Sequence, residues 1–393
     1  MTRHAIIAGV GMIPFAKPGR SASYDIMGRD AVRAALADAG IEYADVGQAY
    51  ASYVYGMSTS GQQSLYQVGL SGIPIINVNN NCASGSSALF LARQAVESGE
   101  VEVALAFGFE EMLPGVPGSE TAGRKNIMEM QERTRFELLG NHPEVMITGQ
   151  YFGGAGQEYA DKYGTAPEVF AMISAKARRH AAHNPYAVFR EPLSVAEVLA
   201  SKLIFGLLTR LQCCPPTCGA AAAIVVSSEY AARQGIAGIE ILAQSMTTDV
   251  ASAFDSRSMI QLIGYDMSRN AANQVYERAG IGPEDLDVVE LHDCFTTNEL
   301  LTYEAIGLTS EGGAERFIRD GDNTYGGRYV VNPSGGLLSK GHPLGATGLA
   351  QCAELVWQLR GTADQRQVEG ARLGLQHNLG MGGACVVTLY GAN

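Results

Sequence analysis

Apolar runs of strand length alternate with amphipathic stretches along this chain. Residues 5–11 (AIIAGVG) and 101–112 (VEVALAFGFEEM) are apolar enough for buried strands, and residues 219–231 (GAAAAIVVSSEYA) return to strand character. Residues 25–40 (DIMGRDAVRAALADAG) have the spacing of an amphipathic helix that ends near Gly40. This succession of strand, helix and strand predicts an α/β fold with largely parallel sheets.

One long stretch, residues 113–210, interrupts the alternation. It is richer in charge, glycine and proline than the segments on either side of it. We expect an inserted, mostly helical lobe at this place.

The two ends of the chain carry a faint internal repeat. Residues 35–46 (ALADAGIEYADV) resemble residues 275–289 (VYERAGIGPEDLDVV), at an offset of 279 − 39 = 240. CASGSSALFLARQAV resembles HPLGATGLAQCAELV, which aligns Cys82 with His342 at an offset of 342 − 82 = 260. Two similar α/β halves would explain the repeat, and a pseudo-twofold axis would bring both residues, each opening a helix, to one cleft. Chance similarity is the alternative.

Charge and composition narrow the classes of function. The 393 residues carry a formal net charge of −12, which argues against nucleic acid or an anionic membrane surface as the main partner. A small anionic ligand remains open, because a local basic patch is enough to bind it. No apolar run approaches the roughly 18 residues of a membrane span. The seven scattered cysteines fit a reducing cytoplasm better than a disulfide framework.

Cys82 is the first candidate for chemistry. It follows the apolar run GIPIIN, has Asn80 and Asn81 before it and Ser84, Gly85 and Ser86 after it, and precedes a helical pattern. A buried structural cysteine is the simpler explanation of a free thiol, but apolar neighbours would then be expected. The N–H groups at a helix start lower a thiol pKa and bind an oxyanion, so we expect a nucleophile here.

Three histidines are candidates for the acid and base that such a nucleophile needs. His342 lies in a glycine-rich turn that opens a helix, and His292 and Cys294 follow an apolar strand in VVELHDCF. His377 and Asn378 also follow an apolar stretch, and sites form at the carboxyl ends of strands. Zinc is the rival reading, but His292 and Cys294 are the only close pair, so no metal is expected.

Two further motifs are given structural roles. LQCCPPTC contains Cys213, Cys214 and Cys218 with no histidine nearby, and we interpret these cysteines as packing and turn residues. The glycines of SGGLLSKGHPLGATG match neither a phosphate loop nor a dinucleotide fingerprint.

Taken together, the motifs resemble the thiolase superfamily and, within it, thiolases of the sterol-carrier-protein type. The resemblance extends from about residue 5 to the C-terminus, and its segments are NNNCASGSSAL, LQCCPPTCGAAAAI, ELHDCFTTNELLTYEAIGL, NPSGGLLSKGHPLGATGLAQCAELVWQLRG and LQHNLGMGGACVVTLY. The HDCF tetrapeptide marks this branch, because ordinary thiolases have an Asn-Glu-Ala-type motif there. Ordinary thiolases also carry a second catalytic cysteine in the last glycine-rich loop, where this chain reads HNLGMGG. The resemblance therefore implies Cys294 as that second cysteine.

The resemblance also implies roles for the other residues. Cys82 attacks the C3 carbonyl of a 3-oxoacyl-CoA, and His342 raises its thiolate character and binds a thioester oxygen. Cys294 protonates the departing acetyl-CoA carbanion and then deprotonates the incoming CoA thiol. His292 helps to hold the oxygen that becomes enolate. The N–H groups of Cys82 and Gly380 form a second oxyanion hole, and His377 and Asn378 support the site.

A thiolase fold follows from the same resemblance: an α/β protein of two βαβαβαββ halves in a five-layer αβαβα sandwich. The expected parts are an N-terminal half (1–112 and 211–235), a loop domain (113–210) and a C-terminal half (236–393). The family's loop domain binds CoA, so Lys176, Arg178, Arg179 and His180 are candidates for its phosphates; a solvated helix face is the alternative.

The remaining expectations concern partners and location. Acyl-CoA and coenzyme A are expected as substrates, with no tightly bound cofactor, in a homodimer or homotetramer. The last residues, YGAN, are not a peroxisomal address, so a bacterial cytoplasm is expected. A retro-aldolase or acetyltransferase on the same fold, or a non-catalytic lipid-binding scaffold, are the alternatives.

Overall fold

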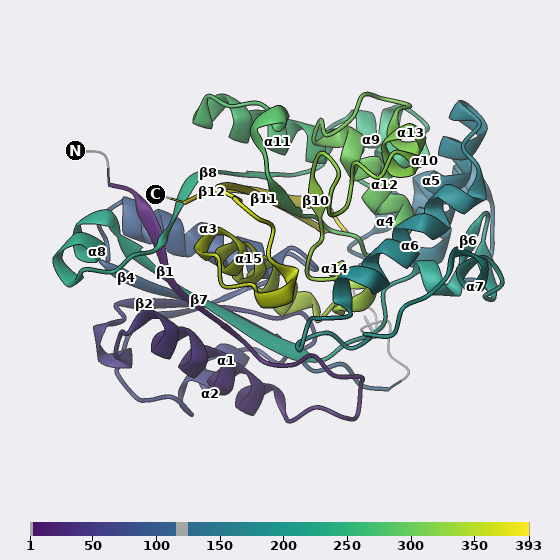
Figure 1. Cartoon of the computed structure of the whole chain (residues 1–393). Helices are drawn as coiled ribbons and strands as arrows, with labels where there is room; N and C mark the ends of the chain where they lie inside the picture. Colours follow the sequence, from purple (N-terminus) through teal and green to yellow (C-terminus); the bar gives the residue numbers. More distant parts are fainter. Residues whose placement is uncertain (1–2, 115–124, 393) are drawn as a thin grey trace.

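The computed structural model describes residues 3–114 and 125–392, and a sheet of ten strands runs through it (Figure 1). The first five strands in this sheet are β1 (Ala5–Met12), β2 (Gln48–Ser52), β3 (Ile75–Val78), β4 (Val103–Glu110) and β7 (Gly219–Ser227). The other five are β8 (Ile239–Thr247), β9 (Val288–Glu290), β10 (Val330–Val331), β11 (Leu373–Gly380) and β12 (Ala384–Gly391). The first expected strand, helix and buried strand are thus present within two residues of the predicted bounds.

The sheet order repeats between the two halves. The strands lie in the order β10-β9-β11-β12-β8-β1-β7-β4-β2-β3. Read from its outer edge inward, each half presents its third, second, fourth, fifth and first strand along the sequence. The halves join where β1 pairs with β8, through Ile6 with Glu240 and Ile7 with Ile239. Since chance similarity would not produce one topology twice, the internal repeat in the sequence reflects two equivalent halves.

The expectation of largely parallel sheets is only half right. In each half two pairings are parallel, namely β2 with β3 and β4, and β9 with β10 and β11. The last strand of each half, β7 or β12, is antiparallel to both of its neighbours. For β12 the cause is a tight turn through residues 381–383, which returns the chain directly beside β11.

Helices cover both outer faces and fill the space between the halves, which gives the five expected layers (Figure 1). Helix α1 (Tyr24–Ala39) packs on β1 and β7, with α2 (Ser60–Leu65) beside it. Helix α11 (Tyr265–Ala279) packs on β8 and β12. The central helices, α3 (Ser84–Glu97) and α15 (Leu344–Arg360), pack against each other.

The lobe between β4 and β7 is mostly helical, as expected. It contains α4 (Glu129–Leu139), α5 (Ile147–Tyr163), α6 (Pro167–Ala181), α7 (Val195–Leu199) and a hairpin of β5 (Leu203–Phe205) and β6 (Leu208–Thr209). Helices α5 and α6 pack on α12 (Thr296–Ala305), so the lobe shares a hydrophobic core with the C-terminal half. Residues 115–124 of the expected loop domain lie outside the described residues, and the domain boundaries stay a prediction.

Short helices complete the structure: α8 (Ser228–Gln234), α9 (Ser252–Asp255), α10 (Met259–Leu262), α13 (Ala314–Arg319) and α14 (Gly336–Ser339). The expected strand 219–231 is shorter than predicted, since β7 ends at Ser227 and the residues after it belong to α8. The Ser227 hydroxyl caps this helix, because it accepts a hydrogen bond from the Tyr230 N–H. In the described residues, no helix is both long and apolar enough to cross a membrane.

Candidate active site

A tight turn presents the Cys82 thiol. Strand β3 ends at Val78 and α3 begins at Ser84, and between them Asn81 adopts a left-handed backbone with φ of 52°. Asparagine tolerates this conformation better than most residues. The Ser84 hydroxyl closes the turn, since it accepts from the Asn80 N–H at 2.8 Å and donates to the Asn81 carbonyl at 2.6 Å. The thiol is thereby held just before the helix, as the sequence indicates.

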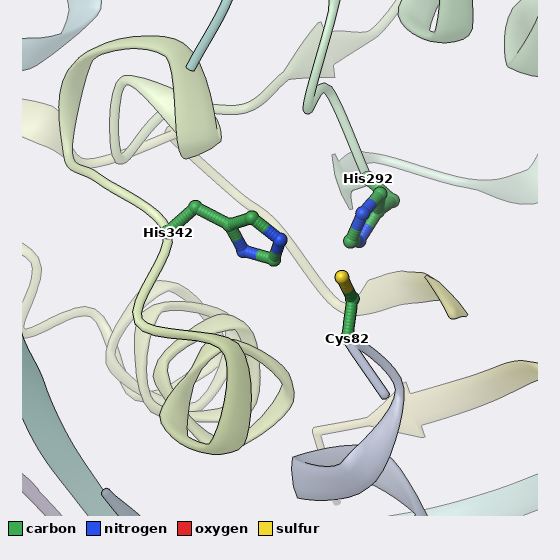
Figure 2. A group of neighbouring side chains, drawn as sticks. All are labelled: Cys82, His292 and His342. Atoms are coloured by element: carbon green, nitrogen blue, oxygen red, sulfur yellow. The ribbon is translucent and has the colours of Figure 1, made fainter. Parts of the chain in front are cut away.

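Two histidines converge on this thiol. The Sγ of Cys82 and one ring nitrogen each of His292 and His342 lie within 4.8 Å of one another. Figure 2 shows the thiol directed into the space between the two imidazole rings, whose centroids are 5.0 Å apart. Helices α3 and α15 begin at an offset of 344 − 84 = 260, the same offset that separates Cys82 from His342. The internal repeat thus places both residues at one cleft.

The orientation of His342 leaves a basic nitrogen toward the thiol. Its Nδ1 lies 2.7 Å from the Thr347 hydroxyl oxygen, and that hydroxyl donates its own hydrogen to the Pro343 carbonyl at 2.9 Å. Nδ1 must therefore donate, and the lone pair is on Nε2, which has no hydrogen-bond partner among the described residues. Burial lowers the pKa of His342 to about 3, so the ring is neutral.

The expected low thiol pKa is not found. Burial, and after it the negative charge of Glu110, raise the pKa of Cys82 to about 12. The N–H groups of Met381 and of Cys82 itself act in the opposite direction but do not overcome these two effects. Cys82 and His342 are therefore both neutral at rest.

The Met381 N–H, which the sequence analysis did not name, lowers the pKa of the Cys82 thiol, and the role expected for the Gly380 N–H stays a prediction. Gly380 ends β11, and a Cβ there would lie 2.3 Å from the Asn80 carbonyl oxygen and 3.0 Å from the Ala83 nitrogen. Its missing side chain lets β11 approach the Cys82 turn. The Asn81 side chain then donates to the Met381 carbonyl at 3.1 Å, and the Met381 N–H reaches the thiol.

Cys294 lies near both Cys82 and a cysteine that the sequence analysis assigned to packing. Burial and the neighbouring Cys214, Cys82 and Asp293 hold the pKa of Cys294 well above its usual value. Cys214 lies on the opposite strand of a short antiparallel bridge, and its N–H donates to the Cys294 carbonyl at 2.9 Å. Cys294 is thus a neutral thiol, which is the form of a proton donor.

His377 and Asn378 occupy opposite faces of β11. Asn378 reaches His292, with its Nδ2 2.9 Å from Nδ1 of that ring. His377 turns the other way, and its Nε2 lies 2.9 Å from the Ser268 hydroxyl on α11. Its Nδ1 accepts from the His292 N–H at 3.5 Å, so His377 contacts the site only through the backbone of His292.

The predicted basic face of α6 does not form. Lys176 is buried, pairs with Glu299 and donates to the Val331 carbonyl at 3.2 Å. His180 is also buried, with its Nδ1 3.0 Å from the Asn332 carbonyl. Lys176 and His180 lie one helical turn apart on the inward face of α6, which is an amphipathic helix. Arg178 is half-buried and Arg179 is exposed, so of the four candidates only the arginines remain open to a ligand.

Glu110 is a site residue that the sequence analysis missed. Its carboxylate accepts hydrogen bonds from the N–H groups of Val54, Tyr55 and Gly345, and the last of these lies three residues after His342. The Ser52 hydroxyl donates to the Gly345 carbonyl at 2.7 Å, which fixes the same point from the other side. An acidic residue at the end of the apolar run VALAFGFE was the available signal.

Cys82, His292 and His342 also have the spacing of three metal ligands. Sulfur and imidazole nitrogen are ligands that zinc prefers. The expectation that no metal is bound stays a prediction.

Comparisons with known proteins agree with this architecture. A family model described as the N-terminal domain of thiolase matches residues 5–198, and one described as thiolase C-terminal domain-like matches residues 249–390. Sterol carrier protein 2 of Oryctolagus cuniculus is 53% identical over 391 residues, which cover 98% of this chain and 71% of that protein. The benzoylsuccinyl-CoA thiolase subunit BbsB of Thauera aromatica is 37% identical over 389 residues, which cover 97% of this chain and 96% of the subunit.

A solved structure titled Ltp2-ChsH2(DUF35) aldolase superposes with a TM-score of 0.83 at 25% sequence identity and covers 99% of this chain and 98% of its own. Two equivalent α/β halves, with a cysteine and two histidines where they meet, form the architecture of the thiolase fold. The chain belongs to the thiolase superfamily. The resemblance to its sterol-carrier-protein branch is confirmed by the similarity to sterol carrier protein 2.

Proposed function

We propose that this protein is a 3-oxoacyl-CoA thiolase, which cleaves its substrate with coenzyme A into acetyl-CoA or propionyl-CoA and a shortened acyl-CoA. The pathway would be the β-oxidation of fatty acids or sterol side chains. The observation that supports the proposal is the meeting of the Cys82 thiol with the unprotonated Nε2 of His342, beside the N–H groups of Cys82 and Met381.

The first half-reaction forms an acyl-enzyme. His342 Nε2 takes the thiol proton while the Cys82 sulfur bonds to C3 of the substrate. The oxyanion on C3 is held by the N–H groups of Cys82 and Met381, which are fixed before the reaction begins. The bond between C2 and C3 then breaks, and its electron pair forms an enolate on the leaving acetyl-CoA. His292 and the protonated His342 donate to the enolate oxygen, and the Cys294 thiol protonates C2.

The second half-reaction regenerates the enzyme. The Cys294 thiolate takes the proton of the incoming CoA thiol, and the CoA sulfur attacks the acyl carbonyl. Cys82 leaves as a thiolate and recovers its proton from His342. Every proton thus returns to its starting group, and no redox partner is needed.

A small, largely apolar pocket lies next to Met381, and we propose that the acyl chain enters here. Its volume is about 20 Å³, and its lining includes Tyr151, Phe152, Met267, Leu379 and Met381. Phe152 also stacks on Phe295, the residue after Cys294, with ring centroids 4.4 Å apart. The loop domain therefore contributes side chains both to this cavity and to the support of the second cysteine.

A steady-state assay with acetoacetyl-CoA and CoA tests the proposal. The wild type should produce two acetyl-CoA per substrate, and Cys82→Ala should lose this turnover. Cys213→Ser is the matched control, because Cys213 donates only to the Thr209 carbonyl at 3.5 Å and serine keeps that bond. Full turnover by the Cys82→Ala variant would contradict the mechanism.

The aldolase with the same fold favours a second candidate function, a retro-aldol cleavage of an acyl-CoA ester. That reaction needs no cysteine nucleophile, since the carbonyl product leaves without an acyl-enzyme. An aldolase would release an aldehyde or ketone from a 3-hydroxyacyl-CoA in the absence of CoA. Product analysis on 3-hydroxy and 3-oxo substrates therefore separates the two functions.

We also propose a homodimer in a bacterial cytoplasm. Strand β3 lies at the edge of the ten-stranded sheet, and all four of its residues are only partly buried. Tyr66 and Leu70 nearby are 54% and 81% exposed. An apolar edge strand of this kind favours pairing with a second copy. Sedimentation of the purified protein at one protomer mass would contradict this assembly.

A further inference from the structure

Asn378 lies between two buried groups that fix which way its side-chain amide points. Its Oδ1 accepts a hydrogen bond from the Ser86 hydroxyl at 2.9 Å, and its Nδ2 lies 2.9 Å from Nδ1 of His292. All three side chains are at most 2% exposed. Because an amide nitrogen can only donate, Nδ1 of His292 must accept, and the single proton of the neutral ring is then on Nε2.

Further hydrogen bonds, on the side of Asn378 away from His292, fix the orientation of the Asn378 amide. The Tyr390 hydroxyl donates to Oε1 of Gln376 at 2.5 Å, so the Gln376 amide nitrogen faces the Ser86 oxygen at 2.8 Å. Ser86 accepts that hydrogen bond and uses its own hydrogen toward Asn378. Each group in this buried series of hydrogen bonds accepts on one side and donates on the other, so all of the bonds run in one direction.

The two histidines at the thiol therefore present opposite groups. His342 donates from Nδ1 to Thr347 and offers a lone pair on Nε2. His292 accepts at Nδ1 and offers an N–H on Nε2. Figure 2 shows both rings facing the Cys82 sulfur. One ring can take the thiol proton, and the other can donate to an oxygen that becomes negative.

We propose that Asn378, held by Ser86 and Gln376, is a positioning residue that fixes His292 in the tautomer with its proton on Nε2. His292 is thereby a permanent hydrogen-bond donor. That the oxygen it serves is the enolate oxygen rests on the proposed function, whereas the tautomer does not. The same arrangement opposes metal binding. Nε2 could bind a metal ion only through a free lone pair, and in this tautomer Nε2 carries the proton instead.

Asn378→Asp tests this inference with almost no change of shape. A carboxylate cannot donate to Nδ1, so the His292 proton should move from Nε2 to Nδ1. Imidazole ¹⁵N NMR of histidine-labelled protein at pH 8 reports the change, and His292→Gln identifies the resonances. We expect a pyrrole-type Nε2 in the wild type and a pyridine-type Nε2 in Asn378→Asp. A pyridine-type Nε2 in the wild type, or a pyrrole-type Nε2 in the variant, would overturn the inference.

Asn184→Asp is the matched control. Asn184 is also buried, and its Nδ2 donates to the Ser334 carbonyl at 2.8 Å. This variant reports the general cost of a buried carboxylate and should leave the His292 tautomer unchanged. If Asn378→Asp does not fold, Ser86→Ala replaces it, since loss of the hydroxyl frees the Asn378 amide to rotate. Mixed tautomers are then expected, and a pure Nε2–H form would contradict the role of Ser86.

Kinetics separate this inference from the proposed function. Loss of one oxyanion donor lowers kcat by about 10²–10³-fold, and we expect this loss in Asn378→Asp with little change in KM for CoA. If the wild type forms no acyl-enzyme, the proposed function fails and the tautomer result stands. If the tautomer switches while kcat stays at the wild-type value, the positioning role is wrong and the proposed function stands.

Discussion

Glu110 offers a prediction whose size follows from the structure. Its carboxylate is 1% exposed and has no cation within ion-pair distance in the described residues. Burial raises the pKa of Glu110 to about 7, although hydrogen bonds from the Tyr55, Gly345 and Val54 amides act against this rise. The native protein therefore holds a proton at Glu110 that the unfolded chain has already lost between pH 4.5 and 7.

This difference makes the wild type less stable as the pH rises. A carboxyl pKa raised from 4.5 to about 7 corresponds to about 3 kcal/mol, present below pH 4.5 and lost as the pH passes 7. Glu110→Gln cannot ionise and has no such loss. Its amide nitrogen opposes a backbone N–H, which costs about 1–3 kcal/mol at every pH. Between pH 4.5 and pH 8 the unfolding free energy of the variant should therefore gain about 3 kcal/mol relative to the wild type.

Urea unfolding at a series of pH values measures this difference directly. Glu111→Gln is the control, because Glu111 accepts from the Tyr24 N–H at 2.9 Å and is only partly buried. The thiol gives a second readout, since the Glu110 charge raises the pKa of Cys82. The rate at which iodoacetamide alkylates Cys82 should therefore begin to rise at a lower pH in Glu110→Gln than in the wild type. Glu111→Gln should show no such shift. Parallel stability curves for Glu110→Gln and the wild type would refute the reasoning.

Two other predictions concern helix α6. Lys176→Met should destabilise the protein by about 3–5 kcal/mol, because Glu299 is then left buried and unpaired. The KM for CoA should stay unchanged. Thermal unfolding and steady-state kinetics measure these two quantities, and a raised KM with normal stability would mean that Lys176 contacts substrate. Arg179→Glu should raise KM for CoA several-fold if this exposed residue binds its phosphates. Arg316→Glu, which changes another exposed arginine, on α13, is the control, and equal KM values for Arg179→Glu and the wild type would remove Arg179 from the site.

The internal repeat explains why the meeting of Cys82 with His342 could be predicted from the sequence. Cys82 and His342 each lie two residues before a central helix, and the two helices occupy equivalent places in halves of equal topology. His292 was found for a simpler reason, since it follows the end of a buried strand. Local pattern and repeat were sufficient for these three residues because the fold applies the same geometry twice.

The electrostatics of the site could not be read from the local sequence. The helix start next to Cys82 indicates a low thiol pKa, but burial and Glu110 outweigh it. Glu110 comes near the turn only because β4 pairs with β2, which lies beside β3. Lys176 and His180 were misplaced because a run of basic residues suggests a solvated face, whereas their spacing of four puts both on the buried side of α6.

The measurement that tests the central claim most directly is mass spectrometry of the protein mixed with acetoacetyl-CoA in the absence of free CoA. The account predicts one acetyl group on Cys82, no adduct on the Cys82→Ala variant, and release of the acetyl group when CoA is added. An unmodified Cys82, with acetoacetyl-CoA and with a branched 3-oxoacyl-CoA, would contradict the thiolase mechanism.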